Sequence, residues 1–209
     1  TLKLNWNRIE AKDRPDYGPN SDHTIGNQSG HYLITQATSE HSKGQAERIL
    51  TTTIEVPDDG QPYCLSFYHY VVSYDMLLYV TYIQLNATES ENATGKLNYQ
   101  IWPPYYGYKY IRDKWAWAIA SLLPGTFKLS FLIANRNSYN LTTSLDDIKV
   151  HSCPAVNDPL TAYDPSDSYF FEFECDFETD RCGFSEDQDL ITRNEGGYDS
   201  NEQRAARRP

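Results

Sequence analysis

Positive charge is scarce in this sequence. Its 209 residues include 18 Lys and Arg against 29 Asp and Glu, which gives a formal net charge of −11. Proteins that bind nucleic acids concentrate Lys and Arg against the phosphates, so this balance argues against a nucleic-acid partner. The same deficit disfavours binding to anionic membrane surfaces.

Long apolar runs and helical periodicity are also missing. No stretch approaches the roughly 20 apolar residues of a transmembrane helix, so we predict no membrane span in this chain. No signal peptide opens the chain, and we expect a processed or excerpted part of an ectodomain. No segment keeps a 3.6-residue apolar period with capping residues, which argues against a helical fold.

The common sequence signatures of catalysis are absent. The five histidines are His23, His31, His41, His69 and His151. None belongs to a His-Glu-x-x-His pair, and no Gly-x-Ser-x-Gly motif occurs anywhere in the chain. We therefore predict that the chain is not an enzyme and has no catalytic residues.

Aromatic residues are abundant, with 17 Tyr and eight Phe against one Met. Such side chains suit the half-buried surface of a β-sheet. Residues 126–134 alternate cleanly and place Phe127, Leu129, Phe131 and Ile133 on one face. Further strands are expected at 31–36, 46–56, 63–72, 76–85, 97–102 and 144–151. The pattern predicts an all-β sandwich.

A second clear alternation lies near the end of the chain. From Phe171 to Phe177 every odd position is apolar and every even position is acidic, which is typical of a strand with one buried face. Six residues separate Cys175 from Cys182, a spacing that suits a small disulfide loop. Only 25 residues follow Phe184, too few for another complete sandwich.

Cysteines and glycosylation sequons point to the secretory pathway. The four cysteines are Cys64, Cys153, Cys175 and Cys182, and they allow three disulfide connectivities. The Asn-x-Ser/Thr sequons begin at Asn27, Asn86, Asn92 and Asn140. Together these features predict an extracellular protein with disulfides and N-linked glycans.

Several motifs carry a resemblance to a known family. They are Trp6-Asn-Arg8, Gly18-Pro-Asn-Ser-Asp-His-Thr24, Gly30-His-Tyr32, Leu145-Asp-Asp-Ile148 and Cys175-Asp-Phe-Glu-x-x-x-Cys182-Gly-Phe184. This set resembles the MAM domain, the extracellular module of meprins, neuropilins and receptor tyrosine phosphatase mu. The resemblance implies a jelly-roll-like antiparallel β-sandwich. It also favours the pairs Cys64–Cys153 and Cys175–Cys182, as does proximity in sequence.

The order of these motifs is unusual, because the opening motif of the family comes last. Residues 1–153 resemble a MAM body that lacks its first strand and first cysteine pair. Residues 154–168, rich in Pro, Asp and Ser, are predicted to be a linker. Residues 169–209 resemble the first strand and cysteine pair of a following repeat.

Four acidic residues form a candidate metal site. The resemblance places Asp22, Asp146, Asp147 and Glu178 near one end of the sandwich. Carboxylate oxygens are the ligands that Ca²⁺ prefers, and some MAM domains hold such an ion. The alternative is that these acids accept bonds from backbone N–H groups and from arginines such as Arg8.

Aromatic residues supply candidate interface positions. One set lies in the Tyr-rich stretch around two prolines and consists of Trp102, Tyr105, Tyr106, Tyr108 and Tyr110. Exposed aromatic rows of this kind serve protein interfaces and sugar stacking. The alternative places Trp102 and Trp115 in the core with the tyrosines covering it. The other set is the apolar face of the late strand, Phe171, Phe173 and Phe177.

These observations predict a non-enzymatic extracellular module for adhesion or assembly, with other copies or tandem repeats as partners. A body that lacks a strand exposes an apolar groove, which residues 169–185 can fill. They could enter the next molecule and form a head-to-tail fibre, belong to a tandem array, or fold back into their own body. Two further alternatives are an accessory ectodomain of a larger cell-surface enzyme or receptor, and a sugar-binding jelly roll.

Overall fold

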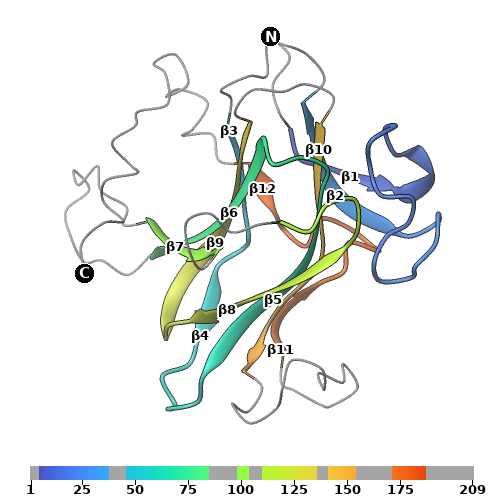
Figure 1. Cartoon of the computed structure of the whole chain (residues 1–209). Coiled ribbons are helices and arrows are strands. Elements are labelled where there is room, and N and C mark those ends of the chain that lie inside the picture. Colours follow the sequence, from blue (N-terminus) through green and yellow to red (C-terminus); the bar gives the residue numbers. More distant parts are fainter. Residues whose placement is uncertain are drawn as a thin grey trace.

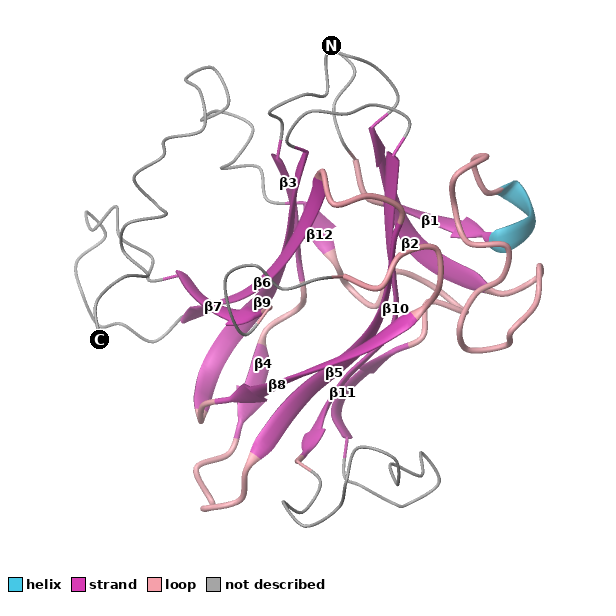
Figure 2. Cartoon of the chain, in the orientation of Figure 1, coloured by secondary structure: helices cyan, strands magenta, loops and turns pink. Residues whose placement is uncertain are grey.

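Two antiparallel β-sheets pack face to face in the computed structural model (Figure 1). The structure describes residues 5–37, 46–84, 98–103, 110–135, 141–153 and 171–186. Within these ranges the one helical element is a short 3-10 turn, η1 (Ala11–Asp13), on the loop that follows the first strand (Figure 2). None of the described residues form a helix long and apolar enough to span a membrane.

Each sheet contains six strands. The first sheet has the order β1 (Asn7–Glu10), β2 (His31–Ala37), β10 (Leu141–Ser152), β5 (Tyr63–Val71) and β8 (Ala116–Leu122), and β11 (Phe171–Cys175) also pairs with β10. The second has the order β12 (Ser185–Glu186), β3 (Ala46–Leu50), β9 (Gly125–Asn135), β6 (Met76–Gln84) and β7 (Asn98–Trp102), and β4 (Ile54–Val56) also pairs with β9. The prediction of an all-β, jelly-roll-like sandwich is confirmed.

A single apolar core fills the space between the sheets. The ring of Phe67 lies 5.5 Å from that of Phe131 on the opposite sheet and 5.2 Å from that of Trp102, both in edge-to-face geometry. All three side chains are buried. Alternate residues of β5, β6, β8 and β9 supply most of this core, as the period-two pattern predicts.

Two details of the strand prediction are wrong. The stretch 46–56 forms two strands, because Thr51 leaves the ladder and its hydroxyl accepts a bond of 3.0 Å from Leu129 N–H. Strand β8 was not predicted at all. Three of its four buried positions are the small residues Ala116, Ala118 and Ala120, so the sequence lacks the usual contrast between large apolar and polar positions.

The long loop between β1 and β2 lies against the outer face of the first sheet. Tyr32 Oη donates to Pro19 O at 3.0 Å, Trp115 Nε1 donates to Ser21 O at 2.9 Å, and the rings of Tyr32 and Trp115 meet edge to face. A small second cluster lies beneath the loop and consists of Ala11, Tyr32 and Ile34 with Ile9 and Trp115. This packing holds residues 22–25 over strand β10.

Candidate functional site

Residues 171–186 close one side of the sandwich by pairing with both sheets. Strand β11 runs antiparallel to the second half of β10, with Cys175 opposite Ile148. Strand β12 runs antiparallel to β3, with Ser185 opposite Leu50. Of the three completions considered from the sequence, the single chain in this structure has the fold-back one. We call residues 171–186 the closing segment.

The closing segment inserts two aromatic side chains into the core. Phe177 is fully buried and Phe184 is 6% exposed. Their rings lie 5.6 Å apart, and the ring of Phe184 lies 6.0 Å from that of Phe131. Complete burial of one phenylalanine contributes roughly 1.5–3 kcal/mol, so these two side chains are strong anchors.

Arg8 of β1 fixes the backbone of the closing segment. Its Nε donates to Phe177 O at 2.6 Å and its Nη2 donates to Glu178 O at 2.7 Å. Phe177 has φ 59°, in the left-handed region, and the guanidinium group meets the two carbonyls beside this turn. Charge-assisted bonds of this kind are stronger than neutral ones, so Arg8 acts as a clamp.

Further contacts complete the surface that receives the closing segment. Glu178 accepts from His31 N–H at 2.9 Å, and Arg181 Nη2 donates to Trp6 O at 3.2 Å. Gly183 has φ 72°, and a Cβ there would overlap the side chain of Thr52. We call the receiving surface the slot: strands β3 and β10 with Trp6, Arg8, His31 and Thr52.

A second candidate site lies where β10 departs from regular pairing. The register of β10 against β5 shifts between Asp146 and Lys149, and Asp147 has φ 48°. In a regular strand two consecutive side chains point to opposite faces. The bulge instead lets both Asp146 and Asp147 bond to residues 23 and 24 of the overlying loop.

His23 is the centre of this acidic cluster. Its backbone N–H donates to Asp146 Oδ2 at 2.7 Å, and its Nδ1 lies 2.6 Å from Asp147 Oδ2. The imidazole stacks on the ring of Tyr68 with the centroids 3.3 Å apart. Thr24 Oγ1 adds a bond of 3.0 Å to Asp147. The cluster therefore fastens the loop to the sheet.

Asp22 serves the loop itself. Its carboxylate accepts from Ile25 N–H at 2.5 Å and from Asn27 N–H at 3.1 Å. The side chain of Asp22 is 1% exposed and rests against Gly30, where a Cβ would overlap the carboxyl group. A buried carboxylate with two backbone donors is a structural element of a tight loop.

The pKa values of the two bulge carboxyls are shifted in opposite directions. Burial raises the pKa of Asp146 to about 8, although the N–H groups of His23 and Asp147 act against this change. Burial also acts to raise the pKa of Asp147. Bonds from His23 and Thr24 outweigh it there and hold the pKa of Asp147 below its ordinary value.

Comparison with known families assigns most of this sandwich to one family. The model of the MAM domain family, meprin/A5/mu, matches residues 1–154, which is more than half of the chain. The chain belongs to the MAM family. The slot motifs Trp6-Asn-Arg8 and Gly30-His-Tyr32 and the bulge motif Leu145-Asp-Asp-Ile148 all lie inside the matched range.

Two solved structures are similar to this MAM chain. They are the K1 and K3 cleaved adhesin domains of Lys-gingipain from Porphyromonas gingivalis. The K1 domain is 18% identical with a TM-score of 0.38, and the K3 domain is 17% identical with a TM-score of 0.39. Each comparison covers 71% of this chain and 91% of the adhesin domain. The similarity is distant.

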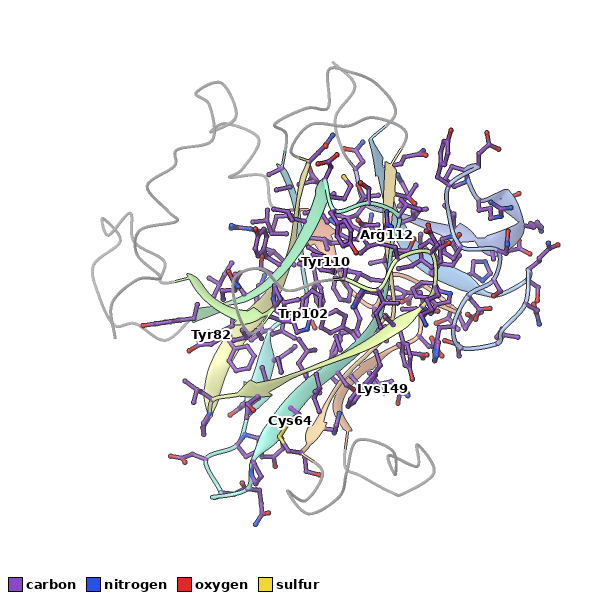
Figure 3. The ribbon with its side chains drawn as sticks, viewed as in Figure 1. Cys64, Tyr82, Trp102, Tyr110, Arg112 and Lys149 are labelled. Carbon is purple, nitrogen blue, oxygen red and sulfur yellow. A yellow bond between two sulfur atoms is a disulfide. The ribbon has the colours of Figure 1, made fainter. Side chains whose placement is uncertain are left out.

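Both disulfides that the MAM resemblance implied are present. Cys64 pairs with Cys153 and Cys175 pairs with Cys182, and the described residues contain no free cysteine. The first joins the start of β5 to the end of β10 (Figure 3 labels Cys64). The second closes the loop that carries Phe177.

The four predicted calcium ligands do not converge on one point. Glu178 lies in the slot against His31, whereas Asp146 and Asp147 bond to His23. Within the described ranges, no three His, Cys, Asp or Glu side chains are arranged as a metal site. Hydrogen atoms of N–H and hydroxyl groups already point at these oxygens. Three of these acids accept bonds from backbone N–H groups in this structure, and calcium binding stays a prediction.

Chelation tests the calcium prediction through the melting temperature. An ion bound only to the folded chain would stabilise it by mass action, so its removal would lower the Tm by several degrees. The measurement is a thermal melt at low ionic strength with EDTA, and then with excess CaCl₂. A fall that Ca²⁺ reverses would support the calcium prediction for Asp22, Asp146, Asp147 and Glu178, and an unchanged Tm would contradict it.

The prediction of an exposed aromatic row fails for its first and last residues, Trp102 and Tyr110. Trp102 is 2% exposed and Tyr110 is 5% exposed, and both lie between the sheets (Figure 3). Tyr110 Oη donates to Leu78 O at 2.7 Å, which satisfies its polar atom inside the core. Tyr105, Tyr106 and Tyr108 lie outside the described residues. The interface prediction is therefore wrong for Trp102 and Tyr110, because they supply core packing.

The late strand has a buried apolar face, as its alternation predicts. Phe177 is fully buried and Phe173 packs against the core at its edge. In this structure they contact the body of the same chain, and their contact with another copy stays a prediction. The side chain of Phe171 is not among those described.

Sequence reasoning missed one unusual core residue, His69. It is fully buried, and neither ring nitrogen has a hydrogen-bond partner. The rings of Trp102, Tyr110 and Phe67 surround it at 5.0, 6.0 and 6.1 Å. Burial lowers the pKa of His69 to about 4. The sequence carried one signal for this burial: His69 lies two positions from both Phe67 and Val71, on the same apolar face of the strand.

Only one predicted glycosylation site can be placed. Asn27 is exposed on the β1–β2 loop, and its Oδ1 accepts from Ser29 N–H at 2.8 Å and from Ser29 Oγ at 2.7 Å. Asn86, Asn92 and Asn140 lie outside the described residues. Glycosylation at all four positions stays a prediction.

Proposed function

We propose that this chain is a non-catalytic extracellular module that binds proteins, and that copies of it assemble head to tail by exchanging residues 169–185. MAM domains are extracellular adhesion-type modules, and two disulfides suit that environment. The observation that carries the finer proposal is the closing segment. It completes both sheets, yet residues 154–170 alone connect it to the preceding body.

Exchange between copies would conserve every contact of the slot. The same Arg8 clamp and the same two phenylalanine anchors would form, whichever chain supplies the segment. Seventeen connecting residues can span roughly 55 Å when extended, which is enough to reach a neighbouring molecule. Because each copy would then give one segment and receive another, the contact is heterologous and can propagate as a fibre.

Protein concentration decides between folding back and exchange. A short tether gives the chain's own segment an effective concentration on the order of millimolar, so self-closure is favoured in dilute solution. Exchange gains as the total concentration rises, and it is favoured further if the connection is made too short to reach the chain's own slot. The proposal therefore predicts assembly that depends on concentration.

Light scattering coupled to size exclusion tests the assembly. For the full chain we expect masses at multiples of 24.1 kDa that grow with loading concentration. A chain without residues 169–209 should not form this series. A chain that lacks only residues 190–209 keeps the closing segment and should behave like the full chain. A full chain that stays monomeric at every concentration, or a truncated chain that still forms the series, would contradict the proposal.

The sugar-binding alternative is less favoured, since Trp102 and Tyr110 are buried and unavailable for stacking. A role as accessory ectodomain of a larger enzyme or receptor is compatible with the same module. Flanking sequence distinguishes it from a stand-alone adhesion protein.

A further inference from the structure

We infer that the slot recognises a fixed pattern, Cys-x-Phe-Glu-x-x-x-Cys-Gly-Phe with its disulfide closed, and accepts it from a second copy of this chain. This inference rests on the proposed exchange and names its recognition code. In this chain the pattern spans Cys175 to Phe184. Each element of the pattern meets a different part of the slot.

The Arg8 clamp recognises the backbone conformation of the closing segment. Arg8 bonds to the carbonyl oxygens of two successive residues, Phe177 and Glu178, at 2.6 and 2.7 Å. Phe177 and Cys182 have φ 59° and 48°, and the Cys175–Cys182 disulfide joins the two ends of this loop. An open chain adopts such left-handed residues only at a cost in free energy. A disulfide-closed loop presents them in advance, so the clamp selects it.

Side chains add sequence specificity. Phe177 and Phe184 fill the core beside Phe131, and Glu178 meets both the N–H and the imidazole of His31. Position 183 must be glycine, because a Cβ there would overlap Thr52. A segment that lacks any of these residues leaves a cavity, an unpaired donor or a clash.

One ion pair at the edge of the slot adds charge complementarity. Lys149 Nζ of β10 lies 2.8 Å from Glu174 Oε1 of β11, and Glu174 is 44% exposed. Neither side chain belongs to the core, so both can be changed without removing packing. This pair makes it possible to label the slot and the segment with opposite charges.

Two defective full-length chains test the recognition between copies. The chain with Arg8→Glu has a damaged slot and an intact closing segment. The chain with Phe177→Ala and Phe184→Ala has an intact slot and a damaged closing segment. Alone, each should melt about 10 °C below the wild type. After co-refolding, a dimer of about twice 24.1 kDa should appear, with a wild-type-like transition for one of its two sandwiches.

A matched pair gives the control. Arg14 bonds to Pro15, Asp16 and Gly18 within its own loop, and Phe127 is buried in β9, where it pairs with Ile54 of β4. The Arg14→Glu and Phe127→Ala chains should not rescue each other. If the slot mixture also melts as the sum of its two components, the slot does not accept a second copy and the inference is wrong.

Charge reversal provides a second measurement on chains with intact cores. Lys149→Glu and Glu174→Lys each place like charges across their own slot. When the two chains are mixed at low salt, reciprocal exchange restores opposite charges at both slots. Native mass spectrometry should then show the mixed dimer about fivefold over its statistical share, with the excess lost at high salt. A statistical distribution or monomers alone would contradict the inference.

The outcomes separate this inference from the proposed assembly. Rescue together with a wild type that stays monomeric would disprove head-to-tail assembly and support the recognition code. A wild type that assembles while neither mixture shows exchange would locate assembly at another surface and disprove the code.

Discussion

Loss of the Cys64–Cys153 disulfide is expected to lower the free energy of unfolding far more than loss of Cys175–Cys182. The two bonds span sequence separations of 89 and 7. A cross-link stabilises by restricting the unfolded chain, and the restriction grows with loop length. The chain-entropy model gives about 4.6 kcal/mol for the long loop and about 2.5 kcal/mol for the short one.

Urea unfolding followed by tryptophan fluorescence measures this difference. The variants are Cys64→Ser with Cys153→Ser, and Cys175→Ser with Cys182→Ser, so that no unpaired thiol remains. Each midpoint, together with its slope, gives the change in free energy. Equal losses would mean that the short disulfide contributes through the native state, by holding Phe177 in the slot, and not through chain entropy alone.

Acidification is expected to remove about 3 kcal/mol of stability through His69 alone. The pKa of His69 is about 4 in the folded chain against 6.5 for a free histidine, and burial is the cause. Between these values the unfolded chain binds a proton that the folded chain does not. The contribution is therefore fully present above pH 6.5 and is lost as the pH falls towards 4.

His69→Phe isolates this contribution. A phenyl ring suits the aromatic surroundings of Phe67, Trp102 and Tyr110 and cannot be protonated. We expect the stability of the wild type relative to the variant to fall by about 3 kcal/mol from pH 7 to pH 4, as measured by urea unfolding at each pH. Parallel curves for the two proteins would exclude His69 as the source.

Asp146 also changes the stability with pH, so the contribution of His69 has to be measured as a difference between the wild type and the variant. Its raised pKa of about 8 stabilises the folded chain below pH 3.8, and this contribution is lost as the pH rises through 8. The effect opposes that of His69 in the range where both titrate. Because Asp146 is present in the wild type and in His69→Phe, its contribution cancels in the difference.

The sequence alone determined the features that depend on local pattern. Alternation in 126–134 and 171–177 identified buried strand faces, since neighbouring side chains in a strand point to opposite sides. The ordered motifs identified the MAM family and through it the disulfide pairing. Where this contrast weakens, as in β8 with its inward alanines, the strand was missed.

Only the tertiary structure decided which distant groups meet. Two consecutive aspartates in a strand would face opposite sides, but the bulge at Asp147 lets both reach His23. Aromatic residues such as Trp102 and Tyr110 suit a core and an interface equally well, so their sequence does not distinguish the two roles. In the structure both pack against His69 inside the core. Arg8 and Phe177 are 169 positions apart, and no local pattern can show that one clamps the other. Such contacts form because the native fold as a whole buries its apolar side chains and satisfies its hydrogen bonds at the same time.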